Sequence, residues 1–166
     1  DVSGVECGCI AAVYLVEAPQ PDSTGSRYCD INSPGSERCT EIDLMEGNTK
    51  AIASTLHTHA GQVGDGSCNQ WGCAQGWGVG DRNCRYGRGS PNIDSSIPFD
   101  VTATVDTSGY MRITVSQDGR SHIIWDVHSP TSMPYWPATT VPEDAIERMY
   151  AALSGGVVFV ASLWGG

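Results

Sequence analysis

The stretch Glu41-Ile42-Asp43-Leu44-Met45-Glu46 decides the architecture, because it interleaves three carboxylates with apolar residues. Side chains alternate faces along a β-strand, so Glu41 and Asp43 share one face and the apolar residues take the other. Strict alternation places Glu46 on the apolar face. A β-bulge around Leu44–Met45 adds one residue and restores the parity, so we predict that all three carboxylates share one face.

Three like charges gathered on one face destabilise a fold, so the arrangement indicates a function. Cleavage of a glycosidic bond uses such groups: one carboxylate acts as nucleophile or base, and a second one with a raised pKa donates a proton. An aspartate between them hydrogen-bonds the nucleophile and helps to keep the outer acids in different protonation states. An acidic edge strand that prevents aggregation is the alternative, but it does not explain the spacing.

The composition of the 166 residues is typical of one β-rich domain with many turns, with 20 glycines and short β-branched runs. The net charge of −10 argues against partners such as nucleic acid or an anionic membrane and suits a secreted protein with a neutral substrate. Seven cysteines between Cys7 and Cys84 favour disulfides and an oxidising compartment over a zinc site. Their odd number leaves a free thiol or a partner outside these residues, so we expect a processed or incomplete piece of a larger secreted chain.

Hydrophobic periodicity and turn signals predict the other elements. In chain order they are a buried strand at 13–16, a long loop at 19–37, the acidic strand at 40–46, a Gly- and Cys-rich loop at 60–98, an antiparallel meander at 99–125 with a hairpin turn at Asp118-Gly119, a helix opened by Pro142 and ended by Gly155-Gly156, and a final buried strand at 157–161. The expected fold is therefore all-β, with one short helix.

Two histidines, His57 and His59, alternate on one strand-like segment after the acidic strand. Together with Glu46 they resemble a metal site, but a histidine beside paired carboxylates also serves to hold or tune an acid, and an ordinary surface or core position is a third possibility. We favour a catalytic or positioning role for one histidine and expect neither a metal nor an organic cofactor.

Several aromatic residues are candidates for binding sugar, since their flat rings stack on the apolar faces of pyranoses. Trp164, beside two glycines at the end of the last strand, is the best candidate. Trp71 and Trp77 lie in the Gly-rich loop, where binding and loop packing are equally supported. Arg85 has the donors to bind sugar hydroxyls, or it pairs with the surplus acids.

Together these pieces resemble glycoside hydrolase family seven, the retaining cellobiohydrolases and endoglucanases of cellulose breakdown. Four blocks in the same order carry the resemblance: Asp1-Val2-Ser3 with Cys7-Gly8 and Ala11-Ala12-Val13-Tyr14-Leu15-Val16, Tyr28-Cys29-Asp30, Cys39-Thr40-Glu41-Ile42-Asp43-Leu44-Met45-Glu46-Gly47-Asn48, and Gly155-Gly156-Val157-Val158-Phe159-Val160-Ala161-Ser162-Leu163-Trp164. The chain departs from the family pattern at Met45, where the family has tryptophan, and at Ile10, where it has asparagine.

The resemblance implies a role for each matching residue. Glu41 would be the nucleophile, Asp43 its hydrogen-bonded modulator and Glu46 the acid/base, with His59 as the family's histidine and His57 as the alternative. The substrate-binding residues would be Tyr14, Asp30, Arg85 and Trp164. Disulfides would join Cys29 to Cys39 and Cys68 to Cys73, and Cys7 would pair beyond residue 166.

The resemblance also implies a fold and an activity. Residues 1–166 would form a single glycoside hydrolase catalytic domain, incomplete at both ends, with an antiparallel jelly-roll (concanavalin-like) β-sandwich and long disulfide-stapled loops. It would be a secreted cellulase that cleaves β-1,4-glucan with retention, endo action being favoured, and its partners would be a β-glucan and further segments of the parent chain. The alternatives are a β-1,3/1,4-glucanase of the family-sixteen type and a noncatalytic polysaccharide-binding wall or matrix protein.

Overall fold

The computed structural model describes residues 1–18, 28–33, 38–58, 68–78, 81–130 and 140–165. Its elements are, in order, β1 (Cys9–Glu17), β2 (Glu41–Gly47), β3 (Ile52–His57), β4 (Cys73–Trp77), β5 (Tyr86–Gly87), β6 (Ile93–Asp94), β7 (Asp100–Val105), β8 (Met111–Gln117), β9 (Arg120–Asp126), α1 (Glu143–Gly155) and β10 (Val157–Gly165). This confirms the expected all-β class with one helix.

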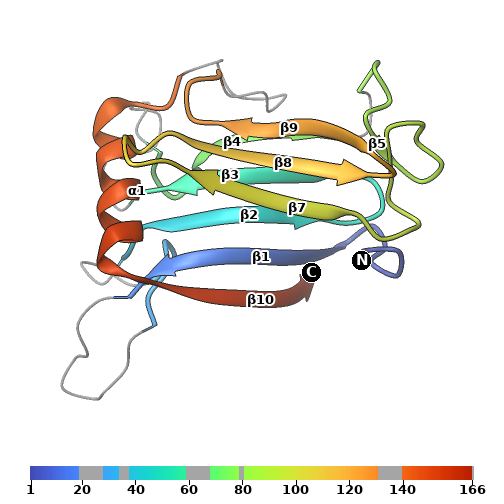
Figure 1. Ribbon diagram of the computed structural model, residues 1–166. Coiled ribbons are helices and arrows are strands. Elements are labelled where there is room, and N and C mark those ends of the chain that lie inside the picture. Colours follow the sequence, from blue (N-terminus) through green and yellow to red (C-terminus); the bar gives the residue numbers. More distant parts are fainter. Residues whose placement is uncertain (19–27, 34–37, 59–67, 79–80, 131–139, 166) are drawn as a thin grey trace.

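Two antiparallel sheets form a sandwich. The larger sheet has the strand order β10-β1-β2-β3-β4, and the smaller has the order β7-β8-β9. In Figure 1 the smaller sheet lies in front of β2, β3 and β4, while β1 and β10 extend below it. Helix α1 runs across one end of the strands (Figure 1). The short strands β5 and β6 pair in parallel beside the sandwich.

The core lies between the sheets because alternate residues of each strand face inward. Strand β8 shows this most clearly, since every second residue from Met111 to Gln117 is buried. From the larger sheet, Ile42, Ile52 and Leu56 enter the same cluster. Trp125 of β9 spans the gap between the sheets, because its indole N–H donates to the carbonyl of Cys73 at 2.9 Å.

The hairpin and the helix lie where the sequence predicted them. Asp118 and Gly119 connect β8 to β9 with φ angles of 51° and 76°, the left-handed pair that a two-residue hairpin turn requires. Helix α1 begins after Pro142, which as N-cap has no side-chain cap, and carries two acids in its first turn. At its end the Gly156 N–H donates to the carbonyl of Ala152 at 3.0 Å, as a glycine beyond a helix end allows.

Two predictions about strands were wrong. The expected loop at 60–98 contains β4 and the short strands β5 and β6. Residues 73–77 form β4 because this Gly- and Ala-containing segment gains its order by pairing with β3. The last strand was expected to be buried, yet β10 pairs only with β1 among the described strands. Its side chains Phe159 and Leu163 are 64% and 70% exposed, because the smaller sheet does not extend over this edge.

Both predicted disulfides are present. Cys29 is bonded to Cys39, and Cys68 to Cys73. The three other cysteines, Cys7, Cys9 and Cys84, are exposed and unpaired within the described residues. No helix in the described part of the chain is both long and apolar enough to cross a membrane.

Two isoleucines on neighbouring strands test the placement of the core. Ile113 is 1% exposed on β8, whereas Ile123 is 48% exposed on β9. We expect Ile113→Ala to lower the free energy of unfolding by about 2–5 kcal/mol because it leaves a cavity. Ile123→Ala, the matched control, should change it by no more than about 0.5 kcal/mol. Urea unfolding measures both, and equal losses would contradict the packing described above.

Candidate active site

A β-bulge in β2 brings the three carboxylates to one face, as predicted. On one side of β2, Tyr14 lies opposite Asp43 and Ala12 opposite Glu46, although only one residue separates them on β1. Leu44 is therefore the extra residue. Because directly opposed residues share a face, and because β1 is regular here, Asp43 and Glu46 lie on the same side of the sheet.

The hydroxyl of Ser54 stabilises the bulge from the neighbouring strand. On that side, the register passes from Thr55 opposite Asp43 to Ala53 opposite Glu46. Ser54 lies between these two pairs and donates its hydroxyl to the carbonyl of Leu44 at 2.7 Å. The carbonyl released from the strand ladder is thus satisfied, as a buried backbone group requires.

The two outer glutamates differ in their hydrogen bonds. Glu41 is buried, and the backbone N–H of Ile31 donates to its Oε2 at 2.9 Å. Glu46 has a weaker partner, the hydroxyl of Thr55 at 3.4 Å from its Oε2. Hydrogen bonds to a carboxylate favour its charged form, so Glu41 is better prepared than Glu46 to carry the negative charge.

Burial raises the pKa of Glu41 to about 7, and it raises that of Glu46 to about 7 as well. The negative charge of Asp43 adds to the effect in both cases. Both carboxyl groups thus have a pKa near neutrality, and each interacts with Asp43 and His57. Near neutral pH the site therefore has both a carboxylic acid and a carboxylate available.

His57 contacts the middle carboxylate. Its Nε2 lies 3.1 Å from Oδ2 of Asp43, and its Nδ1 lies 2.9 Å from the carbonyl oxygen of Asn69. A carbonyl only accepts, so Nδ1 carries a hydrogen and Nε2 is the atom that faces Asp43. Burial acts to lower the pKa of His57, but the contacts with Asp43 and Asn69 outweigh it, and the pKa is raised.

These shifts predict that acid stabilises the folded protein. Glu41 and Glu46 have a raised pKa when folded, so their contribution to stability is complete below the ordinary value of 4.5 and is lost as the pH rises through about 7. His57 acts in the same direction, because its raised pKa gives stability that is present below 6.5 and lost as the pH rises through the folded value.

Urea unfolding at about pH 5 and about pH 8 measures the effect. The wild type should be less stable at the higher pH, and the Glu41→Gln/Glu46→Gln double variant should show a smaller decline because two of the three groups no longer titrate. A wild type that is as stable at about pH 8 as at about pH 5 would contradict the described environment.

Tyr28 connects two of the predicted substrate-binding residues. The hydroxyls of Tyr14 and Tyr28 are 3.2 Å apart, and the Tyr28 hydroxyl donates to Oδ2 of Asp30 at 2.9 Å. Tyr14 lies opposite Asp43 and therefore on the carboxylate face. Tyr28, which is half exposed, was not among the predicted site residues, although its place beside Cys29 and Asp30 in the sequence was a signal that it belongs there.

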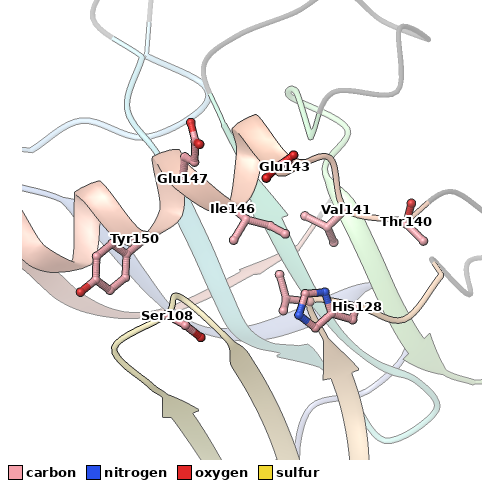
Figure 2. A pocket seen from close by; sticks show the side chains of 9 residues that line it. Ser108, His128, Thr140, Val141, Glu143, Ile146, Glu147 and Tyr150 are labelled. Carbon is pink, nitrogen blue, oxygen red and sulfur yellow. The ribbon is translucent and has the colours of Figure 1, made fainter.

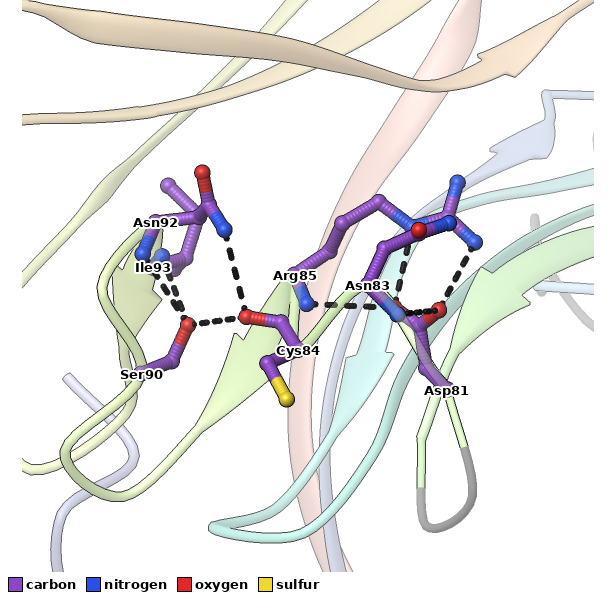
Figure 3. Close-up of polar contacts among 7 residues, drawn as sticks. All are labelled: Asp81, Asn83, Cys84, Arg85, Ser90, Asn92 and Ile93. Carbon is purple, nitrogen blue, oxygen red and sulfur yellow. Dashed lines mark hydrogen bonds and ion pairs between the residues drawn. The ribbon is translucent and has the colours of Figure 1, made fainter.

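Trp164 and Arg85 have different surroundings. Trp164 is 51% exposed on β10, and its partner Ile10 lies on the same face of β1 as Tyr14. Arg85 donates to both carboxylate oxygens of Asp81, at 2.9 and 3.2 Å (Figure 3). Its guanidinium carbon lies 5.1 Å from the ring centroid of Trp77. These hydrogen bonds lower the pKa of Asp81. Arg85 thus pairs with an acid, the alternative that its sequence context allowed, and its contact with substrate stays a prediction.

Several side chains of interest lie elsewhere. His59 is outside the described residues, so its predicted role stays a prediction. Among the residues described, no group of three or more His, Cys, Asp or Glu side chains is arranged to hold a metal ion.

A pocket of about 550 Å³ lies beside α1 and contains none of the three carboxylates (Figure 2). Its lining includes His128, Glu147 and Tyr150.

The fold and the carboxylate face define a class: an antiparallel β-sandwich with three carboxylates gathered on one face of its larger sheet. No family model matches the chain. Among curated proteins it is similar to a probable endo-β-1,4-glucanase celB of Aspergillus clavatus, with 28% identity over 99% of this chain and 50% of that protein. It is also similar to endoglucanase EG-1 of Hypocrea jecorina, with 26% identity over 99% of this chain and 41% of that protein.

Solved structures give the same result for the fold. An endoglucanase I complexed with cellobiose superposes with a TM-score of 0.67 at 22% identity, covering 100% of this chain and 55% of that one. A GH7 family cellobiohydrolase from Daphnia pulex gives 0.65 at 19% identity, covering 100% and 56%. The jelly-roll sandwich and the resemblance to family seven are thus confirmed, and the chain spans about half the length of the relatives it matches.

Proposed function

We propose that this chain carries the catalytic face of a retaining glycoside hydrolase that cleaves β-1,4-glucan. The observation that carries the proposal is the bulge in β2, which brings Glu41, Asp43 and Glu46 to one face, where the pKa of each glutamate is raised to about 7. A buried carboxylate pair of this kind is what glycosidic cleavage requires. The curated relatives that are named endoglucanases support the choice of β-1,4-glucan.

The hydrogen bonds support an assignment of roles. Glu41, which accepts from the Ile31 N–H, stays ionised and attacks the anomeric carbon. Glu46, with its weaker partner, keeps the proton and transfers it to the leaving oxygen as the glycosidic bond breaks. Glu46, now a carboxylate, then takes a proton from water, which attacks the glycosyl-enzyme bond and releases Glu41 with net retention.

Asp43 and His57 have a positioning role in this mechanism. Asp43 lies between the two glutamates in the strand, and its negative charge raises the pKa of both. The charge of His57 lowers both values and so offsets part of this effect. Asp43 and His57 together therefore set the pH range in which one glutamate is protonated while the other is ionised.

The same face offers a surface for a glucan. Tyr14, Tyr28 and Asp30 form a hydrogen-bonded group beside Glu41, and Trp164 presents an exposed ring on β10. Rings and hydroxyls of this kind bind the apolar faces and hydroxyls of sugars. We further propose that residues 1–166 are part of a single catalytic domain, that it acts outside the cell as the two disulfides favour, and that it attacks within the polymer.

Substitution of each glutamate tests the roles. Glu41→Gln should lower kcat on soluble β-1,4-glucan by about a thousandfold or more, because no nucleophile remains. Glu46→Gln should lower it by about 10²–10⁴-fold, but far less on dinitrophenyl cellobioside, because that leaving group needs no proton. Glu147→Gln on the exposed side of α1 is the matched control and should keep full activity. Equal losses for both variants on both substrates would contradict the assignment.

The stereochemistry and the polymer distinguish the alternatives. Retention predicts that NMR detects the β-anomer of the new reducing end first. Endo action predicts a fall in viscosity early in the reaction. Hydrolysis of laminarin alone would indicate a β-1,3-glucanase with the same catalytic residues. Binding of glucan without hydrolysis, by a wild type that circular dichroism shows to be folded, would contradict the enzyme and indicate a polysaccharide-binding protein.

A further inference from the structure

The loop that the Cys68–Cys73 disulfide closes lies directly against His57. Within it, the carbonyl of Asn69 accepts two hydrogen bonds, from the N–H of Gly72 at 2.8 Å and from Nδ1 of His57 at 2.9 Å. The Asn69 side chain accepts from the N–H of Trp71 at 3.0 Å. The turn is therefore held by its own hydrogen bonds, and it presents a fixed acceptor to the histidine.

Gly72 makes the closest approach to the site. A Cβ atom at this position would lie 2.6 Å from Cε1 and 2.8 Å from Nδ1 of His57, and closer still to the Cγ2 methyl of Thr55. Contacts below about 3 Å force something to move. Thr55 is the hydrogen-bond partner of Glu46, and His57 is that of Asp43. The bare α-carbon of Gly72 thus fits between the two side chains that contact these carboxylates.

The loop is also anchored at both ends. Cys68 and Cys73 are buried, and the carbonyl of Cys68 accepts from the N–H and the hydroxyl of Thr58, the residue after His57. The carbonyl of Cys73 accepts from the indole of Trp125 in the opposite sheet. The core of the sandwich therefore fixes the position of His57 through this short, disulfide-closed loop.

We propose that the disulfide-closed loop 68–73 positions His57 against Asp43, with Gly72 as the positioning contact, and so sets the geometry of the catalytic face. This inference rests on the proposed function for its effect on hydrolysis, but its structural part is independent of it. The loop and strand β4 carry no ionisable side chain, and the described ionisable groups that interact with His57 are Asp43, Glu41 and Glu46 of β2. A change in the titration of His57 therefore reports its distance from these three carboxyl groups.

Two glycines with the same backbone conformation give a matched pair of variants. Gly72 and Gly89 both have a φ of +69°, but a Cβ at Gly89 meets nothing within 4 Å. Alanine introduces the same backbone strain at both positions, so the difference between Gly72→Ala and Gly89→Ala isolates the contact with His57 and Thr55.

NMR titration of the His57 ring is the first measurement, with the signal assigned by its loss in His57→Gln. In Gly72→Ala the pKa of His57 should move toward its ordinary value of about 6.5, whereas Gly89→Ala should titrate as the wild type does. In glucan hydrolysis, Gly72→Ala should lose about 10–100-fold in kcat because a displacement of about 1 Å is enough for such a loss, with KM within about threefold of the wild type. Equal titrations in the two variants would overturn the proposal.

A second pair of variants keeps the proposal testable if Gly72→Ala does not fold in the wild-type background. Thr55→Ser removes the methyl that the new Cβ would meet first and keeps the hydroxyl that donates to Glu46. In this background, Gly72→Ala and Gly89→Ala should again differ in the titration of His57. If only the Gly72→Ala member fails to fold, Gly72 is a folding requirement and the positioning proposal is wrong. A wild type that hydrolyses no glucan contradicts the proposed function alone, since the ring titration still decides this inference.

Discussion

The bulge at Leu44 is the constraint on which the site depends. A strand with regular alternation cannot present Glu41, Asp43 and Glu46 on one face and still bury Ile42 and Met45 in the core. One unpaired residue resolves the conflict, and the hydroxyl of Ser54 satisfies the carbonyl that the bulge releases. Substitutions that preserve the number of residues between Asp43 and Glu46 therefore keep both side chains on one face. Insertion or deletion of one residue between them moves one of the two side chains to the opposite face.

The protonation of the three carboxylates depends on the geometry that the bulge imposes. Two buried carboxylates and the half-buried Glu46 cannot all be ionised near one another without a large free-energy cost, so the site retains protons and includes a histidine. The cost is visible in the raised pKa values of Glu41 and Glu46. Such stored electrostatic free energy is what a catalytic site uses and what a purely structural strand avoids.

The sequence predicted those features that depend on local patterns. The bulge followed from parity, the hairpin turn from Asp118-Gly119, and the helix from Pro142 and its acidic first turn. It did not reveal that His57 contacts Asp43, because that contact depends on the backbone carbonyl of Asn69, which holds the histidine ring from a distant part of the sequence. It misplaced β4 because a segment with Ala74, Gln75 and Gly76 has no strand signal of its own. Contacts of Gly72 with His57 depend on the tertiary fold and leave no pattern at all.

The exposure of β10 has a consequence for colloidal behaviour. Strand β10 is nine residues long, carries no charge and no proline, and displays Phe159 and Leu163 at the edge of the larger sheet. Long-range repulsion from the net charge of −10 keeps such edges apart in dilute buffer. Salt shortens the reach of that repulsion from about 30 Å at 0.01 M to about 3 Å at 1 M. We therefore expect the solubility of residues 1–166 to fall as the ionic strength rises.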